Sequence, residues 1–161
     1  MLGSIGDRLT IPFGDPLNAS KYAVHALTDA LRLELGPWDI KVVLIEPASI
    51  RTPAVTKLAA DAERAVNEFS PAGRELYADA YRGMVRRALA REQDGSDPAV
   101  VAAVIAGALS ARRPRRRYLV GKDARVLAVL ARLPGPLLDA VRRIFGLPRP
   151  GSATQGDRQT S

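Results

Sequence analysis

The chain has 161 residues, with 24 lysines and arginines, 17 aspartates and glutamates, one histidine and no cysteine. Its length allows one domain, and a hydrophobic content of 47% is too high for a disordered chain. The absence of cysteine excludes disulfides, thiolate metal sites and a cysteine nucleophile. No apolar run approaches the roughly 18 residues of a membrane-spanning helix, and the chain does not open like a signal peptide. These features predict a soluble, cytoplasmic protein.

The net charge of +7 is concentrated in the second half of the chain. Residues 1–80 carry 8 basic and 11 acidic groups, whereas residues 81–161 carry 16 and 6. The largest basic group is Arg112, Arg113, Arg115, Arg116 and Arg117. Such a group can contact phosphates. Aromatic residues make up only 5% and no nucleic-acid-binding motif is present, so we interpret the charge as a solvated surface. A nucleic-acid or anionic-membrane site is the alternative, and salt-dependent DNA binding would reveal the first of these.

The first half of the chain predicts a helix, a strand and two further helices. The Asp15-Pro16 pair is typical of a helix start, and apolar residues then recur at helical spacing up to Leu35. The β-branched run at 41–46 predicts a strand buried on both faces, which Pro47 ends. Helices are expected over 54–69 and 72–92.

The second half of the chain also predicts helices on either side of a strand. Residues 98–111 predict a helix that is apolar almost all round and should therefore pack on a sheet. A second short strand is expected over 117–121, followed by amphipathic helices over 123–133 and 136–146. The polar residues 147–161 predict a disordered tail.

Strands separated by helices predict an α/β protein with parallel strands. Two strands are few for a parallel sheet, and the apolar helix over 98–111 requires more sheet than they supply. The pattern therefore indicates part of a domain. It also predicts that the strand at 41–46 has an unpaired edge, which favours pairing with another chain.

Three motifs carry a resemblance to a known family. They are the run GSIG at positions 3–6, the run LNASK at 17–21 and the run IEPASIRTP at 45–53. Together they resemble the active-site half of the short-chain dehydrogenase/reductases, nearest the branch acting on steroids and retinoids. The likeness covers about residues 2–146. It implies the C-terminal part of a Rossmann-like, doubly wound parallel sheet, with the N-terminal cofactor-binding half missing.

The resemblance also implies roles for individual residues. Ser4 falls at the position of the catalytic serine, which hydrogen-bonds the substrate oxygen. Lys21 falls at the position of the lysine that lowers the pKa of a catalytic tyrosine and binds the nicotinamide ribose. Pro47, Ile50 and Thr52 match positions that contact the cofactor. The implied cofactor is NAD or NADP, and the implied substrate is a lipophilic alcohol or ketone.

Two departures from the family pattern bear on activity. Leu17 stands where the family has its tyrosine, four residues before Lys21 and on the same helix face. Leucine has no proton to transfer, and loss of a positioned general acid typically costs about 10²–10⁴-fold. Tyr22 cannot replace it, because five residues rotate it roughly 140° around the helix. No Gly-rich phosphate loop precedes Ser4. We therefore expect an oxidoreductase scaffold that is inactive as an isolated chain, a pseudoenzyme.

Other residues have weaker interpretations. His25 is expected at a surface or helix interface. Residues 54–92 match a substrate-covering segment whose apolar side chains are candidates for a pocket, namely Leu58, Phe69, Leu76, Tyr77, Tyr81 and Met84. The amphipathic segment 126–146 is expected to pack on the sheet rather than on a membrane.

A different class of function also stays open. The chain could be a non-catalytic interaction or dimerisation module, a complement to a separate N-terminal half, or the remnant of a broken gene. Size-exclusion chromatography distinguishes a self-associating dimerisation module from a monomer.

Overall fold

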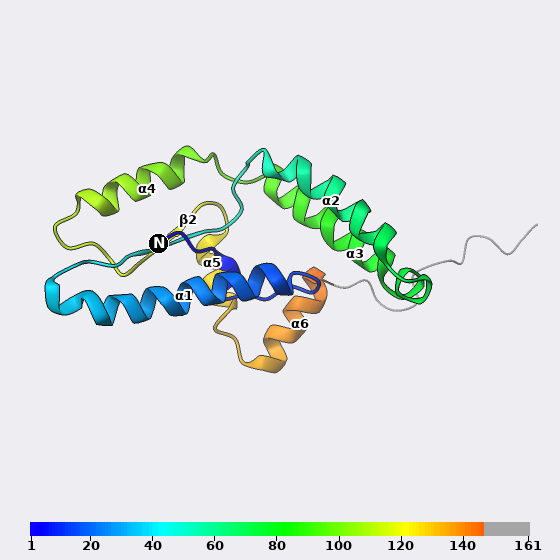
Figure 1. Cartoon of the computed structure of the whole chain (residues 1–161), viewed down its shortest axis with the longest axis horizontal. Coiled ribbons are helices and arrows are strands. Elements are labelled where there is room, and N and C mark those ends of the chain that lie inside the picture. The colour runs from blue at the N-terminus through cyan, green and yellow to red at the C-terminus, as the bar shows by residue number, and fades with distance from the viewer. Residues whose placement is uncertain (147–161) are drawn as a thin grey trace, which may run out of the picture.

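The computed structural model describes residues 1–146, apart from the side chains of 54–56, 58 and 144–146. The elements in chain order are η1 (Ile5–Asp7), α1 (Asp15–Leu35), η2 (Gly36–Trp38), β1 (Leu44–Pro47), α2 (Ala54–Glu68), α3 (Pro71–Gln93), α4 (Ala99–Ser110), β2 (Arg117–Val120), α5 (Ala124–Leu130) and α6 (Gly135–Gly146) (Figure 1). The predicted tail at 147–161 and the predicted pocket residue Leu58 fall outside this description.

The sheet is parallel, as predicted. Leu44 of β1 pairs with Arg117 of β2, and the register continues to Pro47 and Val120. On its other side β1 pairs with the first residues of the chain, since the Gly3 amide donates to the Ile45 carbonyl over 2.8 Å. The prediction that this strand has an unpaired edge is therefore wrong.

Strand β1 begins at Leu44 rather than at residue 41, and it includes Pro47. The residues before it have other partners: the Val43 carbonyl accepts from the Met1 ammonium, and the Val42 carbonyl accepts from Arg32. Helix α5 is likewise shorter than the predicted 123–133, because residues 131–133 form turns. The remaining helices lie within one residue or so of their expected bounds.

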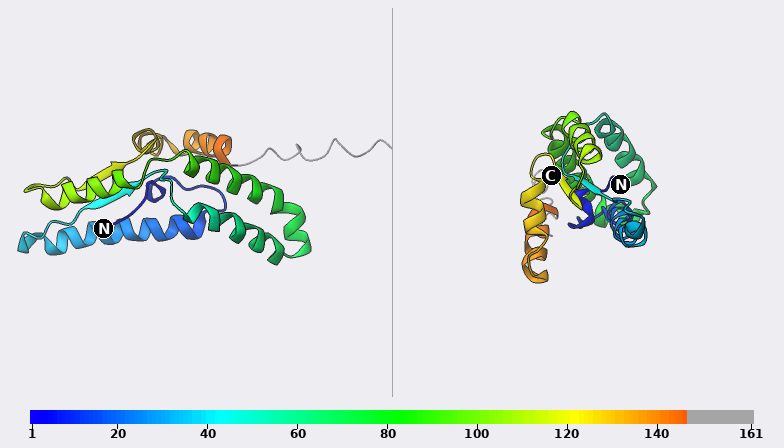
Figure 2. Two further views of the ribbon diagram at one scale, coloured as in Figure 1. Left: turned by 90° about the horizontal axis from the view of Figure 1, so that it is seen from above. Right: turned by 90° about the vertical axis from the view of Figure 1, so that its left-hand side faces the viewer.

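One face of the sheet packs on α4. Ile45, Val120 and Ala108 form a buried apolar cluster, which half-buried residues of α4 and β2 extend. Side chains alternate along a strand, so Ile45 faces α4 while Leu44 and Glu46 face the other way. Figure 2 shows the sheet between α4 on one side and α1 on the other. The predicted packing of the apolar helix on a sheet is confirmed.

Helices α2 and α3 form a hairpin that extends away from the sheet (Figure 1). Ser70 begins α3, because its hydroxyl accepts a hydrogen bond from the Gly73 amide over 3.1 Å and Pro71 needs no amide partner there. The hairpin reaches the loop before α1 through ring contacts of Phe13 with Tyr77 and Tyr81. Within the described residues, no helix is long and apolar enough to cross a bilayer.

The packing of β1 on α4 predicts a clear difference between two apolar truncations. We expect Ile45→Ala to lower the free energy of unfolding by about 2–5 kcal/mol, because Ile45 is buried in the cluster with Ala108 and Val120. The matched control is Leu33→Ala, at a side chain that is 80% exposed, which should change it by no more than about 0.5 kcal/mol. Urea denaturation measures both. Equal losses would contradict this assignment of the core.

Candidate functional site

Ser4 lies where the first strand segment ends and η1 begins. Its backbone is extended, and its Oγ accepts a hydrogen bond from the Gly6 amide over 3.1 Å, which caps η1. The same hydroxyl donates to the Pro47 carbonyl over 3.5 Å. Two of the predicted site residues, Ser4 and Pro47, are thus in contact at the carboxyl ends of neighbouring parallel strands.

A buried asparagine that the sequence analysis did not identify attaches this region to α1. The Asn18 side-chain amide donates to the Gly6 carbonyl over 2.8 Å and to the Leu9 carbonyl over 3.3 Å. Its oxygen accepts from the Ile11 amide over 3.3 Å. Asn18 therefore fixes the loop between η1 and α1 against the first turn of the helix, one residue from Leu17.

Leu17 and Lys21 lie one turn apart on α1, as their spacing predicts. The Leu17 side chain is 62% exposed, whereas Lys21 is half-buried. Among the side chains that the structure describes, none forms a hydrogen bond or ion pair with the Lys21 ammonium, and Ser4 does not contact it. The structure thus places Ser4 beside the start of α1, while the direct grouping of Ser4 with Lys21 stays a prediction.

The loop after β1 holds the other predicted cofactor residues. Ser49 and Ile50 are buried, and Thr52 is half-buried just before α2. The loop is fixed by Ser96, whose amide donates to the Ser49 carbonyl over 3.0 Å and whose carbonyl accepts from the Arg51 amide over 2.9 Å. Gly95 permits this approach, because a Cβ there would lie 2.8 Å from backbone atoms of Ser49.

The pocket-lining residues predicted on α2 and α3 divide into two groups. Phe69, Tyr81 and Met84 are half-buried, and Tyr81 makes edge-on ring contacts with Phe13 and Phe69. Leu76 and Tyr77 are exposed. The aromatic cluster connects the hairpin to the loop between Ser4 and α1, while the substrate-covering role of the hairpin stays a prediction.

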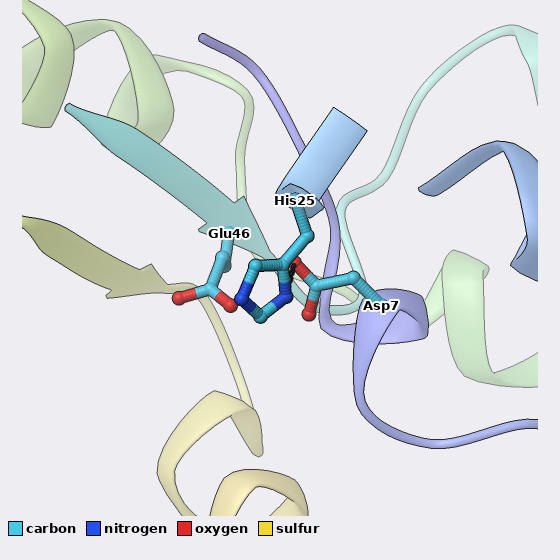
Figure 3. A group of neighbouring side chains, drawn as sticks. All are labelled: Asp7, His25 and Glu46. Atoms are coloured by element: carbon cyan, nitrogen blue, oxygen red, sulfur yellow. Dashed lines mark ion pairs between the residues drawn. The ribbon is translucent and has the colours of Figure 1, made fainter. Parts of the chain in front are cut away.

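A second group of side chains was not foreseen as a group. Asp7, His25 and Glu46 converge from η1, α1 and β1 (Figure 3). The Glu46 carboxylate is fully buried and binds Arg8 through two hydrogen bonds, of 2.7 Å and 3.0 Å. Arg117 of β2 lies 3.7 Å from the same carboxylate. A buried carboxylate needs such partners, because desolvation of an unpaired charge costs several kcal/mol.

The contacts of His25 determine which ring nitrogen carries its proton and in which direction its pKa is shifted. The Arg117 guanidinium, which also binds Asp29 over 3.0 Å, donates to His25 Nε2, so the ring proton belongs on Nδ1. His25 Nδ1 lies 3.3 Å from an Asp7 oxygen. Burial, together with the charge of Arg117, lowers the pKa of His25, so the ring is neutral at pH 7. The expected interface position of His25 is confirmed.

Asp7 is the unusual member of the cluster. Its side chain is 1% exposed, and neither carboxyl oxygen has a hydrogen-bond partner among the described residues. Burial, reinforced by the charge of Glu46, raises the pKa of Asp7 to about 7. The carboxyl is therefore substantially protonated near neutral pH.

The donor atoms of Asp7, His25 and Glu46 lie within 4.8 Å of one another, a separation compatible with a metal ion. The surrounding charges argue against one. Glu46 is already bound by Arg8, and Arg117 occupies the second nitrogen of His25. A divalent cation would lie beside two guanidinium groups. We interpret the group as an ion-pair network that joins η1, α1, β1 and β2.

The raised pKa of Asp7 predicts how stability depends on pH. Between about pH 4 and pH 7 the unfolded chain has lost this proton while the folded chain keeps it, so the free energy of unfolding should fall as the pH rises. Each pKa unit corresponds to about 1.4 kcal/mol, which puts the upper limit near 4 kcal/mol. We expect Asp7→Asn to flatten this dependence and to make the protein more stable than the parent at pH 8.

Urea denaturation at several pH values measures this effect. Asp79→Asn is the matched control, because the Asp79 side chain is 88% exposed and should leave the pH dependence unchanged. If Asp7→Asn and the parent chain had parallel pH profiles, Asp7 would not be the titrating group.

Comparison with known proteins points to the same family as the motifs around Ser4, Lys21 and Pro47. A family model described as short chain dehydrogenase matches residues 2–63. Short-chain dehydrogenase/reductase family 9C member 7 of Bos taurus is 31% identical over 157 residues, which cover 94% of this chain and 50% of that protein. The 3-ketodihydrosphingosine reductase of Bacteroides thetaiotaomicron is 30% identical over 146 residues, covering 89% and 52%. Retinol dehydrogenase 16 of Mus musculus is 31% identical, covering 87% and 45%.

A solved structure is also similar. The crystal structure of a short-chain dehydrogenase from Streptomyces avermitilis aligns with a TM-score of 0.57 and 26% sequence identity, over 89% of this chain and 46% of that one. The chain thus spans about half the length of the relatives that it matches.

Proposed function

The chain belongs to the short-chain dehydrogenase/reductase family, and we propose that it carries the serine and lysine side of an NAD(P)-dependent oxidoreductase site without being catalytically active by itself. The observation that carries the proposal is Leu17. It lies one helical turn before Lys21 at the position where the family has its tyrosine, and its exposed side chain offers no proton.

The roles of the remaining residues follow from their placement. Ser4 keeps a hydroxyl beside Pro47 that can hydrogen-bond a substrate oxygen. Lys21 would bind the nicotinamide ribose, and Pro47, Ile50 and Thr52 would contact the nicotinamide end. The fixed loop after β1 suits such contacts, since Ser96 holds its backbone in place. NAD or NADP would supply the hydride. No described residue takes the part of the proton donor beside it.

The substrate class is proposed from the hairpin and from the relatives. The names retinol dehydrogenase and 3-ketodihydrosphingosine reductase refer to a lipophilic alcohol and a lipophilic ketone. In this chain the ring cluster around Tyr81 offers an apolar surface near the Ser4 loop. We therefore propose a lipophilic alcohol or ketone as the ligand of this side of the site. The cytoplasmic location expected from the sequence stays a prediction.

The proposal predicts weak cofactor binding without turnover. The purified chain should not oxidise NADH or NADPH in the presence of a lipophilic ketone, because Leu17 supplies no acid. Its affinity for the dinucleotide, measured by nicotinamide fluorescence, should fall on Lys21→Ala and stay unchanged on Lys57→Ala, an exposed lysine of α2. Turnover by the parent chain that Lys21→Ala abolishes would refute inactivity while supporting the site itself.

A second candidate is a non-catalytic interaction module. It is favoured by the uncharged sequence of α4, whose Leu109 side chain is 83% exposed. Size-exclusion chromatography distinguishes a self-associating module from a monomer. Salt-dependent DNA binding by the arginine-rich loop before β2 would instead support a nucleic-acid partner.

A further inference from the structure

The turn that follows Ser4 is a short unit held by few hydrogen bonds. The Asp7 amide donates to the Ser4 carbonyl over 3.0 Å, and the Gly6 amide donates to the Ser4 hydroxyl over 3.1 Å. One further bond, from Asn18 to the Gly6 carbonyl, ties the turn to α1. A three-residue helix of this kind can open while the long helices around it stay folded.

The side chain of Asp7 anchors this turn in the interior. It is 1% exposed, and neither of its oxygens has a hydrogen-bond partner among the described residues. Burial of an unpartnered carboxylate is far more costly than burial of the neutral acid. Closure of the turn therefore places Asp7 where its protonated form is strongly preferred, and opening of the turn returns it to water.

The two cations nearest to Asp7 are already engaged by another carboxylate. Arg8 Nε lies 3.7 Å from an Asp7 oxygen but 2.7 Å from Glu46 of β1. Arg117 of β2 lies 3.7 Å from Glu46 as well. Glu46 itself approaches Asp7 within 4.8 Å and would repel a second negative charge there. The cluster thus pairs one buried carboxylate and leaves Asp7 without a dedicated cation.

The helices that pack on the turn supply no further cation. On α1, His25 lies 3.3 Å from Asp7 as a neutral ring, and the carboxylate of Asp29 lies beside the other ring nitrogen at 3.4 Å. Helix α5 also packs against η1, but its buried residues are all apolar and its Arg125 is exposed. Figure 3 shows His25 and Glu46 on either side of the space that the Asp7 carboxyl enters.

We propose that Asp7 is a pH-operated latch on the Ser4 turn. Its protonated carboxyl stays buried and holds η1 closed, whereas its carboxylate favours an open turn in which Asp7 reaches water and Ser4 leaves Pro47. The latch would regulate the proposed site, because it controls where the Ser4 hydroxyl lies. It rests on the proposed function only in treating Ser4 as a residue of that site.

The direction of the pH dependence follows from which state binds the proton. Burial raises the pKa of Asp7 from 3.8 to about 7 in the closed turn. The open turn loses the proton first, so the open fraction should rise by up to about tenfold per pH unit between about pH 4 and pH 7 and then level off. His25 has the opposite sign, because burial lowers its pKa and its titration would close the turn as the pH rises.

Amide hydrogen exchange of the purified chain measures this opening. After correction for the intrinsic exchange rate, the protection of the Gly6 amide should fall at least tenfold from pH 5 to pH 7. The matched control is the Gly73 amide, which donates to the Ser70 hydroxyl over the same 3.1 Å at the far end of the α2–α3 hairpin (Figure 1). Its protection should stay constant.

Two variants and a core amide identify the group and the scale of the motion. Asp7→Asn has no proton to lose in this range, so its Gly6 protection should not change with pH. Asp79→Asn, at an 88% exposed side chain, should keep the slope of the parent. The Leu44 amide lies in the fully buried part of β1 and reports global unfolding, so it should be at least tenfold better protected than Gly6 at pH 7.

Four outcomes would overturn the latch. They are a Gly6 protection that is constant or rises with pH, an equal fall at Gly73, equal protection of Gly6 and Leu44, and a slope that Asp7→Asn retains. The first three are read in the parent chain, so the test does not depend on the stability of a variant. No dinucleotide is needed: a chain that fails to bind NAD or NADP but shows the Gly6 slope would refute the proposed function and keep the latch.

Discussion

The buried carboxylate of Glu46 sets the arrangement of one whole side of the molecule. A charge at this depth must be paired, and it is paired by Arg8 from the segment after η1 and approached by Arg117 from β2. Arg117 in turn reaches His25 and Asp29 on α1. Loss of Arg8 would leave the buried carboxylate with Arg117 at 3.7 Å and no hydrogen-bonded cation, so these elements are fixed relative to one another by charge as well as by packing.

Much of the architecture could be predicted because it depends on local pattern. The Asp15-Pro16 start of α1, the Ser70-Pro71 start of α3 and the uncharged run of α4 each determine their element within a few residues. The errors arose where distant chain segments compete for the same backbone groups. Val43 bonds to the Met1 ammonium instead of extending β1, and residues 1–3 occupy the edge that the strand pattern left open.

The site shows the same division between local and long-range information. Motif spacing was sufficient to place Leu17 and Lys21 one turn apart, and the resemblance led to Ser4 and Pro47, which the structure brings into contact. The neighbours of Asp7 are not evident from spacing, because Glu46 lies on a strand 39 positions later in the chain. A signal was nevertheless present: a glutamate that ends the apolar run Val-Val-Leu-Ile must find a cation once that run is buried.

The two faces of the sheet differ in how they are completed. On the α1 side, the buried Glu46 carboxylate is paired by Arg8, and burial raises the pKa of Asp7 to about 7. On the α4 side, Ile45, Ala108 and Val120 form an apolar core against a helix that carries no charged side chain. Because parallel strands align their ends, Ser4 and Pro47 come into contact at the carboxyl edge of the sheet.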